Sequence, residues 1–140
     1  MQLTFHVQGG DFTRAGDASS QVKKTLKQLN IDPGVTKRVV VALYEAEVNI
    51  VAHAYHGVIT ADIDPVRILL RLEDEGPGIP DIELAMQRGF STASAEVREM
   101  GFGAGMGLPN ILENADQFHI DSVVGKGTTL TIAVNLQPCP

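Results

Sequence analysis

Five stretches of the chain alternate apolar and polar side chains, or carry short β-branched runs, as strands do. They lie at 3–7, 58–64, 66–74, 117–124 and 128–136. The turn residues Asp64 and Pro65 separate the second and third stretches, and Gly-Lys-Gly at 125–127 separates the last two. Such short connections predict two hairpins of antiparallel strands.

Two longer stretches before the first hairpin show helical spacing. Residues 11–30 carry apolar side chains loosely on one helical face. A second helix is predicted from Pro33 or Val35 to about His56, with Gly57 as its C-terminal stop. Its apolar positions are dense, so most of its surface should be buried.

The region between the two hairpins is less regular. Residues 81–89 predict a short helix with Asp81 as its N-cap, and 108–116 predict another with Pro109 in its first turn. Between them, residues 90–107 mix small, hydroxyl and glycine residues without a period. That composition predicts a mobile loop.

The order of these elements indicates the fold class. A doubly wound parallel sheet would not contain so many hairpin-linked strands, so we predict an α/β two-layer sandwich. Its sheet should be mixed and mostly antiparallel, with the helices packed on one face. We expect residues 1–136 to form a single domain and 137–140 a tail.

Composition and charge narrow the classes of partner. Apolar residues make up 44% of the chain and charged residues 20%, as in globular proteins. The formal charge of −6 argues against a nucleic-acid or membrane-surface partner, because both attract basic patches. An anionic ligand stays open, since glycine-rich backbone and a metal ion can supply local positive potential.

The number of cysteines and the hydropathy of the chain indicate the cellular compartment of the protein. The single cysteine, Cys139, rules out a disulfide within the chain. No signal-peptide pattern opens the sequence, and its apolar stretches are shorter than the roughly 20 residues of a membrane span. Together these features predict a cytoplasmic protein.

The long helix carries a seam of polar residues. Glu45, Asn49 and His53 recur at every fourth position in an otherwise apolar segment, so they lie on one helix face. Two interpretations fit the spacing. The seam is a helix edge with a hydrogen bond between Glu45 and Asn49, or a polar ligand docks against it. An amide oxygen suits Mg²⁺, and a nearby carboxylate can deprotonate a hydroxyl.

Two glycine-rich segments accompany the seam. In "LEDEGPGI" at 72–79, a predicted strand runs into Asp74, and the following glycines would let a planar base approach the backbone. A turn with a solvent-facing acid is the alternative. In "GFGAGMGL" at 101–108, alternate glycines precede a helix and can present N–H groups to phosphate. The segment at 101–108 is not a Walker loop, since no Lys-Ser/Thr pair ends it, and it is not a Rossmann loop, because an irregular linker and not a strand precedes it.

These segments, in this order and spacing, resemble the N, G1 and G2 boxes of the GHKL (Bergerat-fold) ATPases. "GTT" at 127–129 is similar to the glycine-threonine element on a late strand of that family. The resemblance runs from about Ala42 to Val134. Within the superfamily the chain looks most like the bacterial serine/threonine kinases of sigma-factor regulation, including the switch-protein kinases.

The resemblance implies a role for each matching position. Glu45 would be the general base, Asn49 would hold Mg²⁺ at the ATP phosphates, and Asp74 would bind the adenine amine together with Thr128. Gly76 and Gly78 would shape the adenine pocket. The remaining cofactor-binding positions are Ile79, Gly101, Gly103, Gly105, Met106, Gly107 and Leu108.

Three functions follow from the resemblance. The first is a Mg-ATP-dependent protein serine/threonine kinase that phosphorylates an anti-sigma-factor antagonist with a STAS domain. The second is an ATP-binding anti-sigma factor that sequesters a sigma factor or another regulator. The third is a stand-alone histidine-kinase-type domain, which the absence of an upstream helix pair with a phosphoacceptor histidine disfavours. A homodimer is compatible with each.

Overall fold

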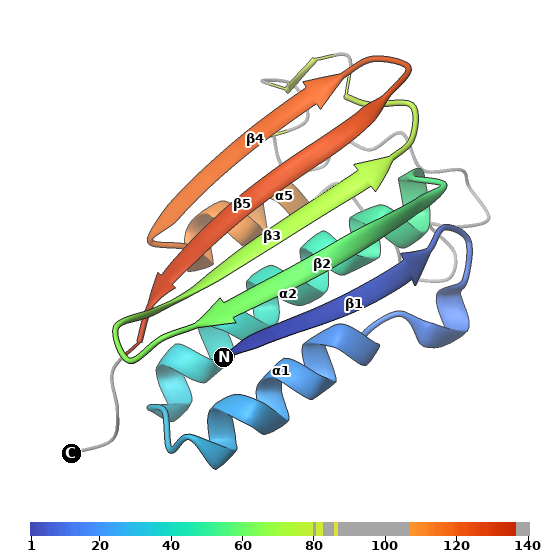
Figure 1. Cartoon of the computed structure of the whole chain (residues 1–140). Helices are drawn as coiled ribbons and strands as arrows, with labels where there is room; N and C mark the ends of the chain where they lie inside the picture. Colours follow the sequence, from blue (N-terminus) through green and yellow to red (C-terminus); the bar gives the residue numbers. More distant parts are fainter. Residues whose placement is uncertain (80, 83–85, 87–106, 137–140) are drawn as a thin grey trace.

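The computed structural model of the protein describes residues 1–79, 81–82, 86 and 107–136 (Figure 1). The predicted helix at 81–89 therefore lies largely outside the described residues, and the predicted loop at 90–107 and tail at 137–140 lie almost wholly outside them. The described elements are β1 (Gln2–Gln8), η1 (Phe12–Arg14), α1 (Asp17–Gln28), α2 (Pro33–His53), β2 (His56–Ile63), β3 (Arg67–Glu75), α5 (Gly107–Asn114), β4 (Gln117–Val123) and β5 (Gly127–Asn135).

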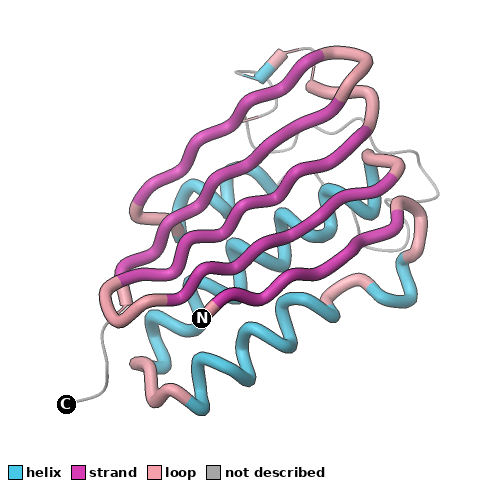
Figure 2. The backbone as a smooth tube through the Cα atoms, in the orientation of Figure 1, coloured by secondary structure: helices cyan, strands magenta, loops and turns pink. Residues whose placement is uncertain are grey.

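The elements form two layers. The five strands make one sheet in the order β1-β2-β3-β5-β4, and α1, α2 and α5 cover one of its faces (Figures 1 and 2). This architecture confirms the predicted α/β two-layer sandwich. Among the described residues, no helix is long and apolar enough to cross a membrane.

The prediction of a mixed sheet is wrong, because all four described strand pairings are antiparallel. The reason is the position of β5. β4 runs in the same direction as β3, but β5 lies between them and pairs antiparallel with both (Figure 1). The last hairpin thus inserts its second strand next to the sheet centre.

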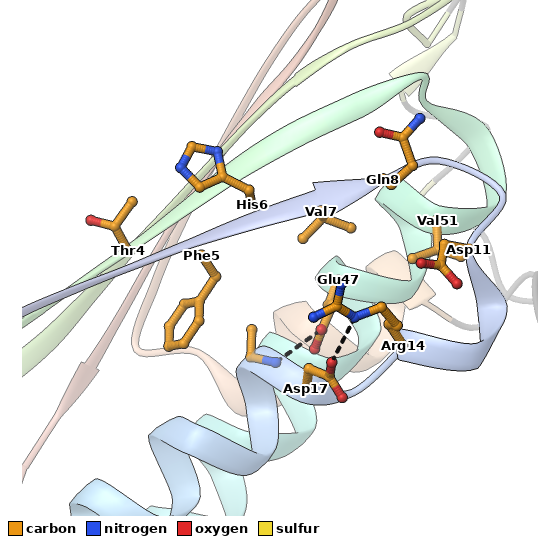
Figure 3. Close-up of a pocket in the computed structure, with 11 residues that line it drawn as sticks. Thr4, Phe5, His6, Val7, Gln8, Asp11, Arg14, Asp17, Glu47 and Val51 are labelled. Atoms are coloured by element: carbon orange, nitrogen blue, oxygen red, sulfur yellow. Dashed lines mark hydrogen bonds and ion pairs between the residues drawn. The ribbon is translucent and has the colours of Figure 1, made fainter.

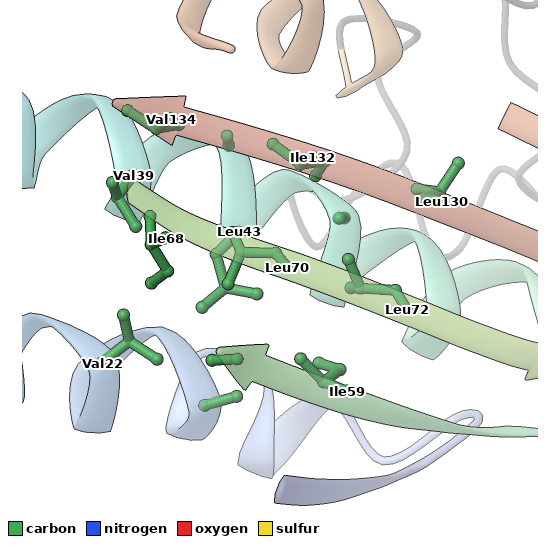
Figure 4. Packing of buried hydrophobic residues seen from close by; sticks show 14 of the residues in the cluster. Val22, Val39, Leu43, Ile59, Ile68, Leu70, Leu72, Leu130, Ile132 and Val134 are labelled. Carbon is green, nitrogen blue, oxygen red and sulfur yellow. The ribbon is translucent and has the colours of Figure 1, made fainter. Parts of the chain in front are cut away.

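The core lies between α2 and the sheet. Leu43 of α2 is fully buried in one cluster with Ile59, Leu70 and Ile132 of the strands (Figure 4). Ile50 of α2, 2% exposed, belongs to the same cluster. Burying a side chain of this size stabilises a fold by about 1.5–3 kcal/mol. This packing holds α2 rigidly against the sheet.

The start of α2 follows the sequence prediction. Asp32 Oδ2 accepts hydrogen bonds from the N–H groups of Gly34 at 3.0 Å and Val35 at 3.1 Å, and Pro33 occupies the first turn. An aspartate N-cap followed by proline is a strong helix start, because it satisfies donors that the helix leaves free. The helix therefore begins at Pro33.

The end of α2 differs from the prediction. The helix stops at His53, and Gly57 lies within β2 opposite Asp74 rather than ending the helix. A Cβ atom on Gly57 would lie 3.1 Å from two methyl carbons of Ile50 and from the carbonyl oxygen of Glu73. The glycine is thus required for close packing of β2 on α2, and no local signal distinguishes that role from a helix stop.

The first predicted helix is divided in two. A short 3-10 turn, η1, precedes Gly16, which has a φ of +99° and separates it from α1. Residues with side chains rarely adopt this left-handed conformation. The glycine therefore interrupts the helix that the apolar spacing predicted over 11–30.

Candidate functional site

The polar seam on α2 faces α5. Glu45 Oε1 accepts a hydrogen bond from Asn110 Nδ2 at 3.4 Å, which joins the two helices. Among the described residues, the partner of Glu45 is thus Asn110 and not Asn49, which disfavours the interpretation as an i,i+4 pair. Sequence reasoning missed Asn110, because its proximity depends on the packing of α5 against α2.

Asn49 lies against the first residue of α5. A Cβ atom on Gly107 would lie 3.0 Å from Asn49 Oδ1. The glycine therefore allows the N-terminus of α5, the positive end of its dipole, to begin beside the amide oxygen. The structure thus brings together three residues that the sequence analysis proposed for the site: Glu45, Asn49 and Gly107.

His53 completes the seam at the C-terminal end of α2. Burial lowers the pKa of His53, so the neutral imidazole is favoured. A neutral ring in a half-buried position suits packing at the helix end better than charge stabilisation.

A second polar group lies at the end of the sheet, on the face that the helices cover. Cross-strand pairing aligns Gly57 of β2, Asp74 of β3, Thr128 of β5 and Ser122 of β4 in one row. The Thr128 N–H donates to Asp74 Oδ1 at 3.1 Å, and Thr128 Oγ1 lies 2.9 Å from Ser122 Oγ. Asp74 and Thr128, predicted to act together, are therefore in contact.

The carboxyl group of Asp74 is electrostatically unusual. Burial raises the pKa of Asp74, and the hydrogen bond from the Thr128 N–H opposes this effect in part. Gly57 contributes no side chain beside it in the row. A half-buried carboxylate acceptor is suited to a ligand that donates a hydrogen bond.

Sequence reasoning also missed Ser122. It occupies an inward position of β4, in line with the partly buried Phe118 and Ile120. The sequence does contain one sign of it: Ser122 stands at a position of the strand where the alternation predicts an apolar side chain. A half-buried hydroxyl there needs hydrogen-bond partners.

The glycines of the segment at 72–79 permit close contacts. A Cβ atom on Gly76 would lie 2.9 Å from Ala54 Cα at the end of α2, and one on Gly78 would lie 2.5 Å from the Val123 carbonyl oxygen. Gly78 also has a φ of +76°. These contacts hold the segment between α2 and the turn that joins β4 and β5, with Ile79 adjoining Ser122.

The remaining predicted positions are less informative. Gly101, Gly103, Gly105 and Met106 lie outside the described residues. Leu108 is buried in α5 and belongs to the hydrophobic core. Its side chain therefore has a packing role that the sequence prediction did not assign.

Glu47, two residues after Glu45, lies on the opposite side of α2. Its side chain is only 2% exposed and accepts hydrogen bonds from the N–H groups of Ala18 at 3.1 Å and Ser19 at 3.2 Å, and from Ser19 Oγ at 2.7 Å. The two N–H groups belong to the first turn of α1. The N-cap of that helix is Gly16, which has no side chain that could accept their hydrogen bonds. A residue of α2 thus caps α1.

A cavity of about 410 Å³ opens beside Glu47 (Figure 3). It lies between β1 and the start of α1 and is lined in part by Phe5, Val7, Arg14 and Val51. None of the predicted site residues lines it. The cavity is therefore separate from the polar seam on α2 and from the row of Gly57, Asp74, Thr128 and Ser122, here called the Asp74 row.

The donor set fits a nucleotide-bound metal ion better than a metal held by protein alone. In the described part of the chain, no group of three or more His, Cys, Asp or Glu side chains could hold a metal. Asn49 offers one oxygen, and Mg²⁺ is usually bound by few protein ligands together with substrate phosphates. The residues present thus fit Mg²⁺ that arrives with a nucleotide.

Comparison with known proteins agrees with this geometry. The sequence family described as the histidine kinase-like ATPase domain matches residues 11–134, which include the seam, the Asp74 row and Gly107. The chain belongs to this family. The resemblance drawn from the N, G1 and G2 boxes is therefore confirmed.

Two relatives of this histidine kinase-like ATPase domain are informative. Serine/threonine-protein kinase RsbT of Bacillus subtilis (strain 168) is 34% identical over 112 residues, covering 77% of this chain and 78% of RsbT. The anti-sigma F factor of Thermoanaerobacter sp. (strain X514) is 40% identical over 92 residues, covering 62% of this chain and 61% of that factor. These names place the domain in the anti-sigma-factor kinase group of the superfamily.

Solved structures show the same fold. One contains the RsbU and RsbW domains of a Mycobacterium tuberculosis protein; it has a TM-score of 0.62 at 17% identity and covers 98% of this chain and 34% of that one. The other is the mycobacterial sensor histidine kinase MprB, with a TM-score of 0.56 at 18% identity, covering 99% of this chain and all of that one.

Proposed function

We propose that the protein is a Mg-ATP-dependent serine/threonine kinase that phosphorylates an anti-sigma-factor antagonist with a STAS domain. The observation that carries the proposal is the position of Glu45 and Asn49 on one face of α2, beside the N-terminus of α5. A carboxylate one turn before a metal ligand is the arrangement that hydroxyl activation needs.

Each group has a defined task in this proposal. Asn49 would hold the Mg²⁺ that neutralises charge on the phosphates, and the N-terminus of α5 would supply N–H donors. Asp74 would accept from the adenine amine, with Thr128 beside it. Glu45 would take the proton from the attacking hydroxyl of the substrate. A protein that only binds a nucleotide has no need of such a general base.

The experiment is a phosphotransfer assay with purified protein, labelled ATP, Mg²⁺ and a STAS-type antagonist from the same genome. We expect phosphate on serine or threonine of the antagonist, stable to acid. Acid-labile phosphate would instead indicate histidine-kinase chemistry, and tight ATP binding without any transfer to antagonists would contradict the kinase assignment.

A second candidate function is sequestration of a sigma factor. The similarity to an anti-sigma F factor favours it. The two functions can coexist, because one requires Glu45 and the other a binding surface. Retention of a sigma factor on immobilised protein, with and without ATP, would reveal it.

Replacing Asp74 by asparagine should increase stability and weaken nucleotide binding. Because the pKa of Asp74 is raised in the folded protein, ionisation destabilises the fold as the pH rises through that pKa, and this penalty disappears at low pH. Asparagine avoids it. We expect a higher melting temperature than wild type at pH 7, with the difference shrinking towards about pH 4.

The same variant should bind ATP about five- to tenfold more weakly, because a charge-assisted hydrogen bond becomes a neutral one. Melting curves without nucleotide and calorimetric titration with Mg-ATP measure the two effects. Equal stability of variant and wild type at every pH would contradict the first, and unchanged affinity would contradict the role of Asp74.

Replacing Gly107 by alanine should affect binding more than folding. Alanine is the better helix residue, but its Cβ would press on Asn49 Oδ1. We expect about tenfold weaker Mg-ATP binding, with a melting temperature within a few degrees of wild type. Gly34→Ala, near the start of α2 and away from the site, is the control and should bind ATP normally.

A further inference from the structure

The outer edge of β1 lacks the features that usually protect an edge strand. β1 and β4 are the two edges of the sheet, and among the described residues only β2 pairs with β1. Edge strands commonly carry charged side chains, proline or a bulge, because these discourage pairing with another chain. β1 contains no Asp, Glu, Lys, Arg or Pro, and its register with β2 is unbroken. Its outer edge is therefore open to an added strand.

The hydrogen-bonding pattern of β1 shows which of its backbone groups face outward. Just before the strand, Met1 and Ile63 exchange two hydrogen bonds, at 2.8 and 3.0 Å. In an antiparallel ladder such hydrogen-bonded pairs alternate with pairs whose N–H and C=O groups point away. In the register of β1 with β2, Thr4 and His6 belong to the second kind. Their N–H and C=O groups therefore point to the free edge.

The cavity beside Glu47 runs along this edge (Figure 3). It is lined by the five consecutive residues 4–8 of β1. Side chains of consecutive strand residues alternate between the two faces, so a cavity that contacts all five follows the edge of the strand. Phe5 and Val7, which point towards the helices, are only partly buried. The side chains of an added strand could therefore enter the space between β1 and α1.

The charges around the cavity indicate which side chain would fit. Its lining includes three carboxylates, Asp11, Asp17 and Glu47, and one guanidinium, Arg14. Arg14 Nε lies 3.4 Å from Asp17 Oδ2, and both side chains are exposed. The other two carboxylates have no such cation among the residues that line the cavity. The excess of negative charge favours a cationic side chain, whose apolar stem can pack on Phe5.

We propose that the outer edge of β1 binds an extended segment of a partner protein as a sixth strand, with a lysine or arginine side chain of that segment in the cavity. The N–H and C=O groups of Thr4 and His6 would form the backbone hydrogen bonds, and the cavity would select the side chain. A second copy of β1 fits less well, because it contains no Lys or Arg. The inference does not rest on the proposed function, since none of the proposed ATP-binding residues lines the cavity.

The test uses a capped probe peptide in which valine, lysine and valine alternate with threonine. Fluorescence anisotropy measures its affinity, and amide hydrogen exchange locates its binding site. We expect saturable binding, with slower exchange of the Thr4 and His6 amides, because both would become hydrogen-bonded to the added strand. A peptide with glutamate in place of lysine should bind about fivefold more weakly.

Two substitutions separate backbone pairing from charge. Thr4→Pro removes an outward N–H and leaves the bonds to β2 in place, so the peptide should bind about tenfold more weakly. Gln2→Pro, at an outward position beyond the cavity, is its matched control. Asp17→Asn should weaken binding of the lysine peptide about two- to fivefold, whereas Asp62→Asn, on β2 and away from the cavity, should not. Should Thr4→Pro fail to fold, N-methylation of the peptide groups that face β1 tests the same pairing on the wild-type protein.

Three results would overturn the inference. The first is no binding of the lysine peptide at millimolar concentration, or equal binding of the lysine and glutamate peptides. The second is binding that leaves the exchange of the Thr4 and His6 amides unchanged. The third is a homodimer, seen by analytical ultracentrifugation, that Thr4→Pro dissociates and Gln2→Pro does not, because a second copy would then occupy the edge.

Discussion

Replacing Glu45 by glutamine will slow phosphotransfer by orders of magnitude and leave nucleotide binding almost intact. Glutamine keeps the size of the side chain and its contact with Asn110 but cannot accept the proton of the substrate hydroxyl. Loss of a general base lowers a rate on the order of 10²- to 10⁴-fold. Phosphorylation of the antagonist in single-turnover assays measures the rate, and calorimetry measures the affinity for Mg-ATP.

The control is Asn110→Ala. It removes the 3.4 Å hydrogen bond to Glu45 but leaves the carboxylate in place, so it should slow transfer only modestly. If Glu45→Gln transferred phosphate as fast as wild type, the general base would have to be another group. If it also lost ATP, Glu45 would be a nucleotide ligand instead.

Replacing Glu47 by alanine will cause the largest loss of stability among the single substitutions considered. It removes three hydrogen bonds and leaves two N–H groups of α1 buried without an acceptor. Breaking such a buried network costs about 3–4 kcal/mol. Urea unfolding followed by circular dichroism measures the free energy of unfolding.

Glu45→Ala is the matched control for that measurement. It removes the same side chain from the same helix, but Glu45 is only half-buried and makes one long hydrogen bond among the described residues. Its loss should cost about 1 kcal/mol or less. Similar losses at both positions would show that the capping of α1 by Glu47 contributes little.

These two glutamates lie two residues apart on α2 and have opposite tasks. Two residues correspond to about 200° around a helix, so Glu45 faces α5 and Glu47 faces α1. The first is left half-exposed in the candidate site, and the second is buried as a cap. We therefore expect activity and stability to be affected separately along one helix.

Much of this protein was determined by local sequence. The Asp32-Pro33 pair begins α2, and the turn residues at 64–65 and 125–127 produce the two hairpins. The four-residue spacing of Glu45 and Asn49 places them on one face of the helix wherever that helix packs. Such features depend on neighbours in the chain, so pattern reasoning can find them.

Tertiary structure decided the rest. The insertion of β5 between β3 and β4, the burial of Gly57 against Ile50, and the capping of α1 by Glu47 each join residues far apart in the chain. The contact of Ser122 with Thr128 likewise exists only because β4 and β5 pair in one register. A sequence pattern records the spacing of residues along the chain, whereas partners across elements are chosen by packing and by the need to satisfy buried polar groups.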